Sequence, residues 1–232
     1  MKKILSFSLY GKNPIYNFGC VENAKLHKKI FEDWEMRVYY NNSVPNETIS
    51  ELKKMNVSLI EVNEDTNYFA SLWRFRAFND PESGYFISRD CDSRISLRDE
   101  QSVEDWIASG KKFHIIRDHP IGHGWVINAG MWGAIIDNNF DILSSITNYL
   151  KESNLPEEKS IDQRYLKDII YPIAKQNLFL NDTFFNYEGI GVPINRDREI
   201  DNYEFIGEPF TEKNEFFQHY RDDIKRKFGY NC

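Results

Sequence analysis

The chain has 232 residues, a formal net charge of −7, 41% hydrophobic residues and 15% aromatic residues. This length and apolar content are enough for a buried core, which excludes a mainly disordered chain and favours one α/β domain, alone or with a small appendage. The negative charge argues against a general nucleic-acid binder. It leaves room for a local basic pocket around one phosphate-bearing ligand.

The cysteines and the N-terminus indicate a compartment. Cys20, Cys91 and Cys232 are widely spaced and form no CxxC pair, which favours free thiols in a reducing environment over a zinc site. Polar Ser6 and Ser8 interrupt the short apolar stretch at the N-terminus, so it does not fit a signal peptide. No apolar run approaches the ~20 residues of a membrane span. We expect a cytoplasmic protein, with peripheral contact at a membrane surface left open.

Apolar periodicity in the first quarter of the chain predicts a β-α-β-α-β series. The expected strands cover residues 3–10, 36–40 and 57–60, and the expected helices cover 21–34 and 45–55. This order favours a parallel sheet with helices on its faces.

The rest of the chain continues the α/β pattern and shows no repeat or linker. After an aromatic-rich helix over 68–78 we expect strands over 84–88, over 113–117 and within 125–136, and helices over 140–150, 161–170 and 212–228. A further helix is expected between Ser96, as its N-cap, and Gly110, as its end. The prediction is a single domain with a Rossmann-type, mostly parallel sheet flanked by helices.

The stretch Ser-Arg-Asp-Cys-Asp-Ser-Arg, from Ser88 to Arg94, follows an expected buried strand directly. Two interpretations are open: a solvated charged turn, or a site in which Asp90 and Asp92 bind a divalent metal ion that also contacts an anionic substrate. An Asp-x-Asp pattern alone occurs about once by chance in a chain so rich in aspartate. Its place at the carboxyl end of a strand in a β-α-β series favours the site.

Several stretches together resemble the sugar-nucleotide-dependent glycosyltransferases of GT-A fold, in particular bacterial and viral members of polysaccharide biosynthesis. In chain order they are SFSLYG, LWRFRAF, YFISRDCDSR, VEDWIASGKKFHIIRDHP, NAGMWG, IDQRYL and FIGEPF. They extend from near Ser6 to near Phe210 and so cover most of the chain. The resemblance implies a GT-A-like domain over 1–232, with a nucleotide-binding half (1–117) and an acceptor-side half (118–232).

The resemblance also implies roles for residues on the donor side. Asp90 and Asp92 would hold Mn²⁺ or Mg²⁺ against the diphosphate of the donor. The other matching positions would contact the nucleotide, its phosphates or its sugar, and these are Phe7, Tyr10, Gly11, Arg74 and Arg76.

On the acceptor side, the segment 128–133 matches the place where donor sugar and acceptor meet, with Asn128, Gly130 and Trp132 as candidate contacts. Asp162 and Gln163 match an Asp-Gln pair near the reacting carbon. Asp162 is the leading candidate for the base of an inverting mechanism, whereas a retaining one relies on the leaving phosphate.

Alternatives stay open for several of these residues. His119 and His123 either shape a loop or contact substrate at the rim of the pocket, and Trp132 either stacks on a sugar or packs in the core. Asp162 and Gln163 could equally begin a helix. Arg89 and Arg94 either contact phosphate or hold the turn.

Two C-terminal features also have alternatives. Related enzymes often supply a third metal ligand from a histidine near the C-terminus, where this chain has only His219, in a charged stretch typical of a solvated helix. The basic residues 225–227 fit a solvated helix with i,i+4 pairing or contact with an anionic membrane surface.

The function predicted from the sequence is metal-dependent transfer of a sugar from a nucleotide diphosphate donor to a carbohydrate or glycolipid acceptor, with no nucleic-acid partner. The alternatives are a nucleotidyl- or phosphotransferase acting on sugar phosphates, and a non-catalytic module that binds sugar nucleotides.

Overall fold

The computed structural model describes residues 1–136, 139–152 and 160–229. Within these residues seven strands form one sheet in the order β3-β2-β1-β4-β6-β5-β7. They are β1 (Lys2–Leu9), β2 (Glu35–Tyr40), β3 (Ser58–Glu61), β4 (Ser83–Ser88), β5 (Phe113–Arg117), β6 (Trp132–Ile135) and β7 (Leu178–Asp182). β6 runs antiparallel to both of its neighbours, and the other pairs are parallel. The predicted α/β class with a mostly parallel sheet is confirmed.

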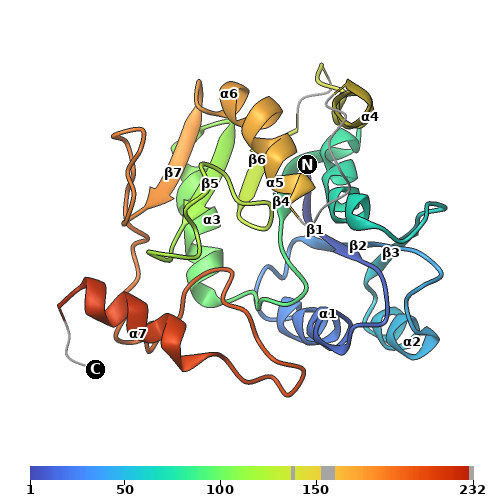
Figure 1. Cartoon of the computed structure of the whole chain (residues 1–232), viewed down its shortest axis with the longest axis horizontal. Helices are drawn as coiled ribbons and strands as arrows, with labels where there is room; N and C mark the ends of the chain where they lie inside the picture. The colour runs from blue at the N-terminus through green and yellow to red at the C-terminus, as the bar shows by residue number, and fades with distance from the viewer. Residues whose placement is uncertain (137–138, 153–159, 230–232) are drawn as a thin grey trace.

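Helices cover both faces of the sheet (Figure 1). One face packs against α1 (Pro14–His27), α2 (Asn46–Lys54) and α3 (Leu97–Ser109). The other packs against the 3₁₀ helix η1 (Tyr68–Asn79), α4 (Ile142–Glu152) and the continuous run of α5 (Ile161–Tyr165), the π-helical η2 (Leu166–Ile170) and α6 (Tyr171–Ala174). The last helix, α7 (Gln218–Lys227), lies at the lower left of Figure 1, at the end of a long C-terminal segment.

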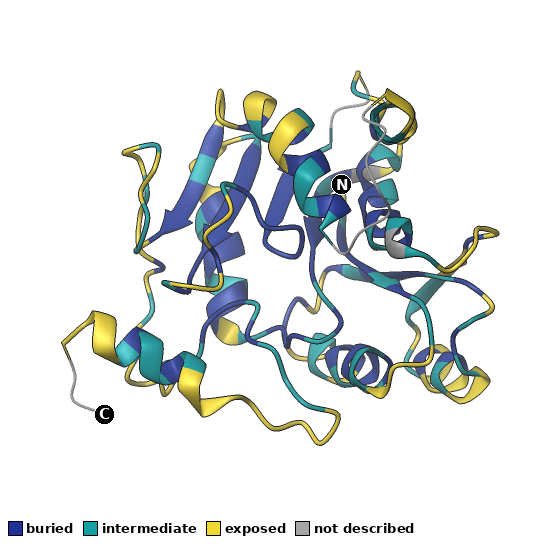
Figure 2. Ribbon diagram, viewed as in Figure 1, coloured by how far each residue is buried: buried dark blue, intermediate teal, exposed yellow. Residues whose placement is uncertain are grey.

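The alternation of side chains along β1 shows why both faces need cover. Ile4 belongs to the apolar cluster under η1 and α4, whereas Leu5 and Phe7 belong to the cluster under α1, α2 and α3. Successive residues of a strand point to opposite faces, so an apolar strand must be buried on both sides. Figure 2 shows the result, with dark blue strands between helices whose outer sides are exposed.

The first helix differs most from its prediction: α1 begins at Pro14 and ends at His27, so the predicted range 21–34 was wrong at both ends. The Asn13 side chain caps it by accepting a 3.0 Å hydrogen bond from the Ile15 amide. Its buried face includes Asn17 and Asn23. Hydrophobic spacing therefore placed this helix seven residues too far along the chain.

Three other elements differ in type or length. The predicted helix over 68–78 is 3₁₀ rather than α, the helix over 161–170 changes to π geometry midway, and α7 begins at Gln218 rather than near 212. The predicted ends of α3 are confirmed, because Ser96 caps its start and Gly110 ends it with a left-handed φ of 66°. None of the described helices is both long and apolar enough to cross a bilayer.

Candidate active site

A cavity of about 240 Å³ lies at the carboxyl ends of β1 and β4. Its lining comes from five separate parts of the chain: Ser8, Tyr10, Tyr16, Ser71, Arg74, Asp90, Cys91, Asp92 and Asp162. Five of the predicted site residues therefore meet here, namely Tyr10, Arg74, Asp90, Asp92 and Asp162. Ligands of open α/β sheets bind at this edge, so the cavity is the candidate active site.

Polar residues of β1 place Arg74 in the cavity. The Ser6 hydroxyl donates a 2.6 Å hydrogen bond to the Arg74 carbonyl, and the Arg74 amide donates one of 2.8 Å to Ser8 Oγ. These bonds fix the backbone of η1 against the end of the strand. In a 3₁₀ helix residues two apart are turned by about 240°, so Arg74 points into the cavity while Arg76 points away.

The buried Arg74 guanidinium bridges two carboxylates. Its Nη1 contacts Asp90 and also donates to the Arg89 carbonyl at 3.2 Å, while its Nη2 donates to Asp162 Oδ2 at 2.9 Å. Burial disfavours its charge, but the charges of Asp90 and Asp162 outweigh that cost and raise the pKa of Arg74 above its ordinary value. Arg74 is thus a permanent cation between two acids.

The two acids differ in their exposure. The Asp162 side chain is 8% exposed and that of Asp90 is 42% exposed. Burial raises the pKa of Asp162 above its ordinary value, Arg74 offsets part of this effect, and the charge of Asp90 adds to it. A carboxylate with a raised pKa is a better proton acceptor than an exposed one, which suits Asp162 to the role of general base.

Gly130 lies against Asp90 and leaves no space for a side chain. A Cβ at Gly130 would come within 1.9 Å of Asp90 Oδ2. The segment is held there by Ala129, whose amide donates to Gln163 Oε1 at 2.6 Å and whose carbonyl accepts from Ser88 Oγ at 2.7 Å. The predicted residue Gln163 therefore positions the chain beside Asp90.

Helix α1 contacts the loop over residues 89–94, which carries Asp90 and Asp92 and is called the acidic loop below. A Cβ at Gly19 would lie 2.0 Å from the Cys91 carbonyl oxygen, so only glycine permits this approach. Asn23 adds two hydrogen bonds, from its Nδ2 to the Ser93 carbonyl at 2.8 Å and from the Ile95 amide to its Oδ1 at 3.0 Å. The buried polar face of α1 thus stabilises the backbone of the acidic loop.

The segment FIGEPF also reaches the acidic loop. The Phe210 amide donates a 2.9 Å hydrogen bond to the Asp92 carbonyl, and Ser93 pairs with Pro209. A stretch more than 110 residues downstream of the motif therefore stabilises the conformation of its backbone.

Two tyrosines line the cavity as neutral groups. Burial raises the pKa of Tyr10 and of Tyr16 to about 12. The Tyr10 ring packs edge-on against Trp73, with centroids 5.9 Å apart. Both hydroxyls keep their protons at neutral pH and are available to donate hydrogen bonds to an anionic ligand.

The cavity also contains residues that the sequence analysis missed, namely Ser8, Tyr16, Ser71 and Cys91. Cys91 lies within the Asp-x-Asp motif itself. Ser6 and Ser8 alternate with apolar residues in β1, and this alternation was the local sequence signal that the end of the strand contributes polar groups to a site.

Three predicted contact residues have side chains outside the cavity. The Phe7 ring is fully buried on the opposite face of the sheet, and Arg76 pairs with Glu64. Trp132 is fully buried, with ring centroids 5.0 Å from Phe86 and 5.4 Å from Phe75. A tryptophan enclosed in this way is a core residue and has no face free for a sugar.

Two further predicted positions are structural neighbours of the site. Gly11 lies two residues after the end of β1, with a φ of 72°, and donates its amide to Ser43 Oγ at 2.7 Å. Asn128 is buried, and its carbonyl accepts the amide of Met131 at 2.9 Å, which makes the turn that leads into Gly130.

The buried histidines shape a loop. His119 Nδ1 accepts the Gly122 amide at 2.9 Å, so its neutral ring donates from Nε2 to the Tyr220 carbonyl at 3.0 Å. His123 Nδ1 accepts the Asp118 amide at 2.9 Å, and burial lowers the pKa of His123 to about 4. These bonds favour the loop-shaping interpretation. His219 is exposed on α7, as expected for a solvated helix.

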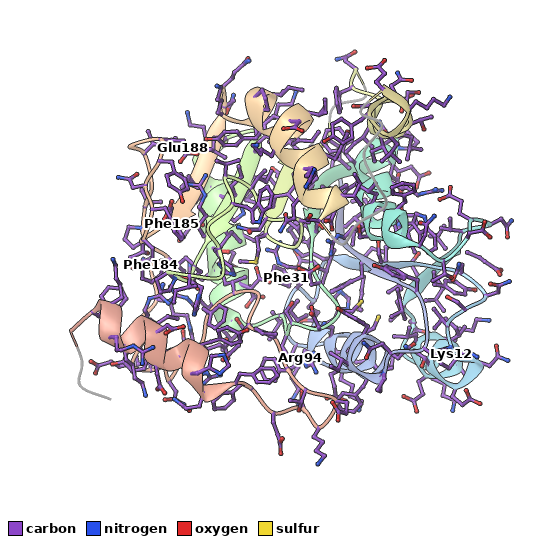
Figure 3. The ribbon with its side chains drawn as sticks, viewed as in Figure 1. Lys12, Phe31, Arg94, Phe184, Phe185 and Glu188 are labelled. Atoms are coloured by element: carbon purple, nitrogen blue, oxygen red, sulfur yellow. The ribbon has the colours of Figure 1, made fainter. Side chains whose placement is uncertain are left out.

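The two arginines of the motif hold its shape. Arg89 is buried and binds Asp99 of α3 through Nε at 2.8 Å, while its Nη1 donates to the Ser88 carbonyl at 2.7 Å. Arg94 donates from Nε to Asn214 Oδ1 at 2.9 Å and lies between α1 and the segment before α7 (Figure 3). Neither side chain lines the cavity.

A larger hollow of about 690 Å³ lies beside the ends of β2 and β3. Its lining includes Glu61, Glu64 and Asp65 but no lysine, arginine or histidine. Its asparagines offer amide donors, but the lining has three carboxylates and no cation to offset the charge of a phosphate, so this acidic hollow is a poor phosphate site despite its size. The smaller cavity around Arg74 is the better candidate.

The donor set of the cavity fits a hard divalent ion. Asp90 and Asp92 are partly exposed and both face the cavity. In the described part of the chain no group of three or more His, Cys, Asp or Glu residues gathers as a closed metal site. Two carboxylates suit Mg²⁺ or Mn²⁺, which keep positions for waters and substrate phosphates.

No protein-family model matches the chain, and no curated protein sequence does. Among solved structures, a glycosyltransferase involved in the glycosylation of the major capsid of PBCV-1 is 17% identical over 78% of this chain and 80% of its own, with a TM-score of 0.49. Glucosyl-3-phosphoglycerate synthase from Mycobacterium tuberculosis is 11% identical over 100% of this chain and 81% of its own, with a TM-score of 0.49. A mannosyltransferase from Pyrobaculum calidifontis, in complex with GDP-Man and Mn²⁺, is 13% identical over 83% of this chain and 55% of its own, with a TM-score of 0.48. At these identities and TM-scores the likeness assigns no role to any residue of this chain.

Proposed function

We propose that the protein is a metal-dependent glycosyltransferase, which moves a sugar from a nucleoside diphosphate donor to a carbohydrate or glycolipid acceptor in polysaccharide synthesis. One observation carries the proposal: Asp90, Asp92 and Asp162 meet a buried arginine in one cavity at the carboxyl edge of the sheet. This set supplies ligands for a metal ion, a cation for phosphate and a base within a few ångströms of one another.

The donor side is assigned to Asp90, Asp92 and Arg74. The two aspartates would hold Mn²⁺ or Mg²⁺, which when bound neutralises the negative charge that grows on the departing diphosphate. Arg74 offers a planar fork of N–H donors that matches phosphate oxygens. The neutral hydroxyls of Tyr10 and Tyr16 add donors at the wall of the cavity.

The acceptor side is assigned to Asp162. Its carboxylate would take the proton of the attacking hydroxyl as that oxygen bonds to the sugar carbon. Arg74 and the Gln163 amide, which donates to Asp162 Oδ1 at 2.8 Å, fix the orientation of the carboxylate. The raised pKa of Asp162 makes it a stronger base than an exposed aspartate.

A thermal-shift screen of nucleotide sugars with and without Mn²⁺ tests the proposal. We expect at least one nucleotide sugar to raise the melting temperature only when Mn²⁺ is present, because a ligand that binds the native state stabilises it. If none does so in wild type, the proposal fails. A nucleotide sugar that binds equally well in chelator, and to Asp92→Ala, would instead indicate a non-catalytic binding module.

A product assay with the donor found in the screen separates the enzyme classes. We expect a glycosylated acceptor together with a released nucleoside diphosphate. Release of pyrophosphate would contradict the proposal and indicate a nucleotidyltransferase.

A further inference from the structure

Arg74 lies where an incoming metal ion would add positive charge. Among the residues that line the cavity it is the one lysine or arginine, and it binds two of the three carboxylates there, Asp90 and Asp162. The lining carries three negative charges against one positive charge, a formal charge of −2, and Arg94 outside it interacts electrostatically with Asp92. A metal ion would lower the negative charge, but Arg74 already occupies Asp90, one of the two predicted metal ligands.

The contact between Arg74 and Asp90 opposes metal binding directly. Nη1 of Arg74 bonds to Oδ1 of Asp90, so that oxygen must give up a charge-assisted hydrogen bond before it can coordinate an ion. A divalent ion held beside a guanidinium would also be repelled by it. Metal binding and the Arg74–Asp90 contact therefore compete.

The two ends of the Arg74 bridge differ in their freedom to move. Asp162 is 8% exposed and receives a second hydrogen bond from the Gln163 amide. Asp90 is 42% exposed, so its carboxylate has room to rotate. In addition, Nε of Arg74 is buried without a hydrogen-bond partner among the described residues. The guanidinium thus keeps an unused donor next to a cavity suited to phosphate.

Resting on the proposed function, we propose that Arg74 is an internal counter-ion that blocks metal binding until the donor arrives. The diphosphate would take over the guanidinium as its partner, which releases Asp90 to bind the ion. Metal and nucleotide then bind cooperatively, and the empty site holds Mn²⁺ only weakly. Arg74 is a positioning residue for the metal in addition to its contact with phosphate.

Titration of Mn²⁺, followed by the electron paramagnetic resonance signal of the free ion, measures this competition without any turnover. Arg74→Gln removes the charge, and Arg76→Gln is the matched control because Arg76 lies on the same helix and pairs with Glu64 outside the cavity. Without nucleotide we expect Arg74→Gln to bind Mn²⁺ about tenfold more tightly than wild type, from the lost charge repulsion. Arg76→Gln should match wild type.

The same titration with UDP or GDP measures the cooperativity. In wild type we expect the diphosphate to raise the affinity for Mn²⁺ strongly, and in Arg74→Gln we expect most of that gain to disappear. A folded Arg74→Gln variant, shown by circular dichroism, with the Mn²⁺ affinity and the nucleotide response of wild type would overturn the inference.

Two outcomes separate this inference from the proposed function. If wild type binds Mn²⁺ in the presence of UDP or GDP, but Arg74→Gln without nucleotide binds Mn²⁺ no more tightly than wild type, the counter-ion role is refuted and the metal site is not. No Mn²⁺ binding in any variant, with or without nucleotide, refutes the metal site itself. If Arg74→Gln does not fold, Arg74→Lys replaces it, because a lysine ammonium cannot fork between Asp90 and Asp162 and should raise the Mn²⁺ affinity of the empty site. Unchanged affinity in folded Arg74→Lys would count against the inference equally.

Discussion

Gly130→Ala adds a single methyl group beside the predicted metal ligand and leaves every charged residue in place. The new Cβ would lie 1.9 Å from Asp90 Oδ2 and 2.5 Å from its Cγ. The backbone at Gly130 has no positive φ, so alanine meets no conformational strain there. The substitution therefore tests the position of the Asp90 carboxylate rather than the presence of the residue.

The required displacement follows from these distances. An ordinary contact between carbon and oxygen is about 3.4 Å, so Asp90 Oδ2 must move by roughly 1.5 Å. A side chain as short as aspartate can do so only by rotating, which also draws Oδ1 away from Arg74. A misplacement of about 1 Å can cost 100-fold in rate, so we expect kcat/KM to fall by roughly that factor.

The assay is donor turnover, together with calorimetric titration of the donor in Mn²⁺, using the nucleotide sugar found in the screen. Gly124→Ala is the control, because the atoms nearest to its added Cβ are 3.8 Å and 4.0 Å away. The backbone amide of Asp90 lies 3.2 Å from the new methyl of Gly130→Ala, so the fold should lose only about 1–2 kcal/mol, as for modest overpacking. Wild-type donor affinity and turnover in Gly130→Ala would refute the placement of the site at Asp90.

Three other changes test separate parts of the structure. Asp162→Asn should keep Mn²⁺-dependent donor binding but lower kcat by about 10²–10⁴-fold. Wild type should lose activity as the pH falls through the raised pKa of Asp162, because the base becomes protonated, and the variant should not show this loss. An unchanged pH–rate profile would exclude Asp162 as the base. Gly19→Ala places a methyl group 2.0 Å from the Cys91 carbonyl oxygen. It should lower the free energy of unfolding, measured with urea, by about 1–3 kcal/mol, and it should weaken donor binding, measured by titration. A variant as stable as wild type would contradict the close approach of α1. Burial lowers the pKa of His114 to about 3, so protonation of the unfolded chain should cost about 3 kcal/mol of stability as the pH falls from 7 to 4. His114→Phe, which keeps a ring against Trp106, should reduce the difference in unfolding free energy between pH 7 and pH 4 by that amount, and an equal difference in both proteins would rule out the assignment.

Much of the fold was predictable because strands buried on both faces leave an unambiguous pattern. The runs that became β1, β2, β4 and β5 are apolar and end at polar residues, and their order implies a parallel sheet. The antiparallel direction of β6 was not predictable, because it depends on the path of the chain after β5 rather than on local composition. The predicted start of α1 failed for a related reason, since its buried face is polar where it contacts the acidic loop.

The site was predictable only in part, because sequence spacing indicates where a motif lies but not where its side chains point. Arg74 and Arg76 look equivalent in the sequence, yet the 3₁₀ helix turns one into the cavity and the other toward Glu64. Trp132 belongs to the stretch NAGMWG, whose resemblance to glycosyltransferases implies a sugar contact, but it is the first residue of β6 and is buried in the core. The backbone conformation therefore decides which residues of a motif have their side chains in the cavity.

The exposure of one carboxylate separates the candidate site from other buried ion pairs of the protein. Away from the cavity, Arg89 binds Asp99 with two nitrogens, Arg221 binds Glu208 in the same way, and Arg117 is shared by Asp182 and Glu188. Each of these carboxylates is at most 11% exposed. The partners in such pairs offset part of the desolvation cost of each other's charge. In the cavity Asp90 and Asp162 share the guanidinium of Arg74, and Asp90 is 42% exposed, so a second cation can reach its carboxylate. The partners in these pairs lie 10 to 88 residues apart in the chain, so the arrangement was not visible in the sequence. It is the feature that best explains why a metal-bound diphosphate would bind at this edge of the sheet.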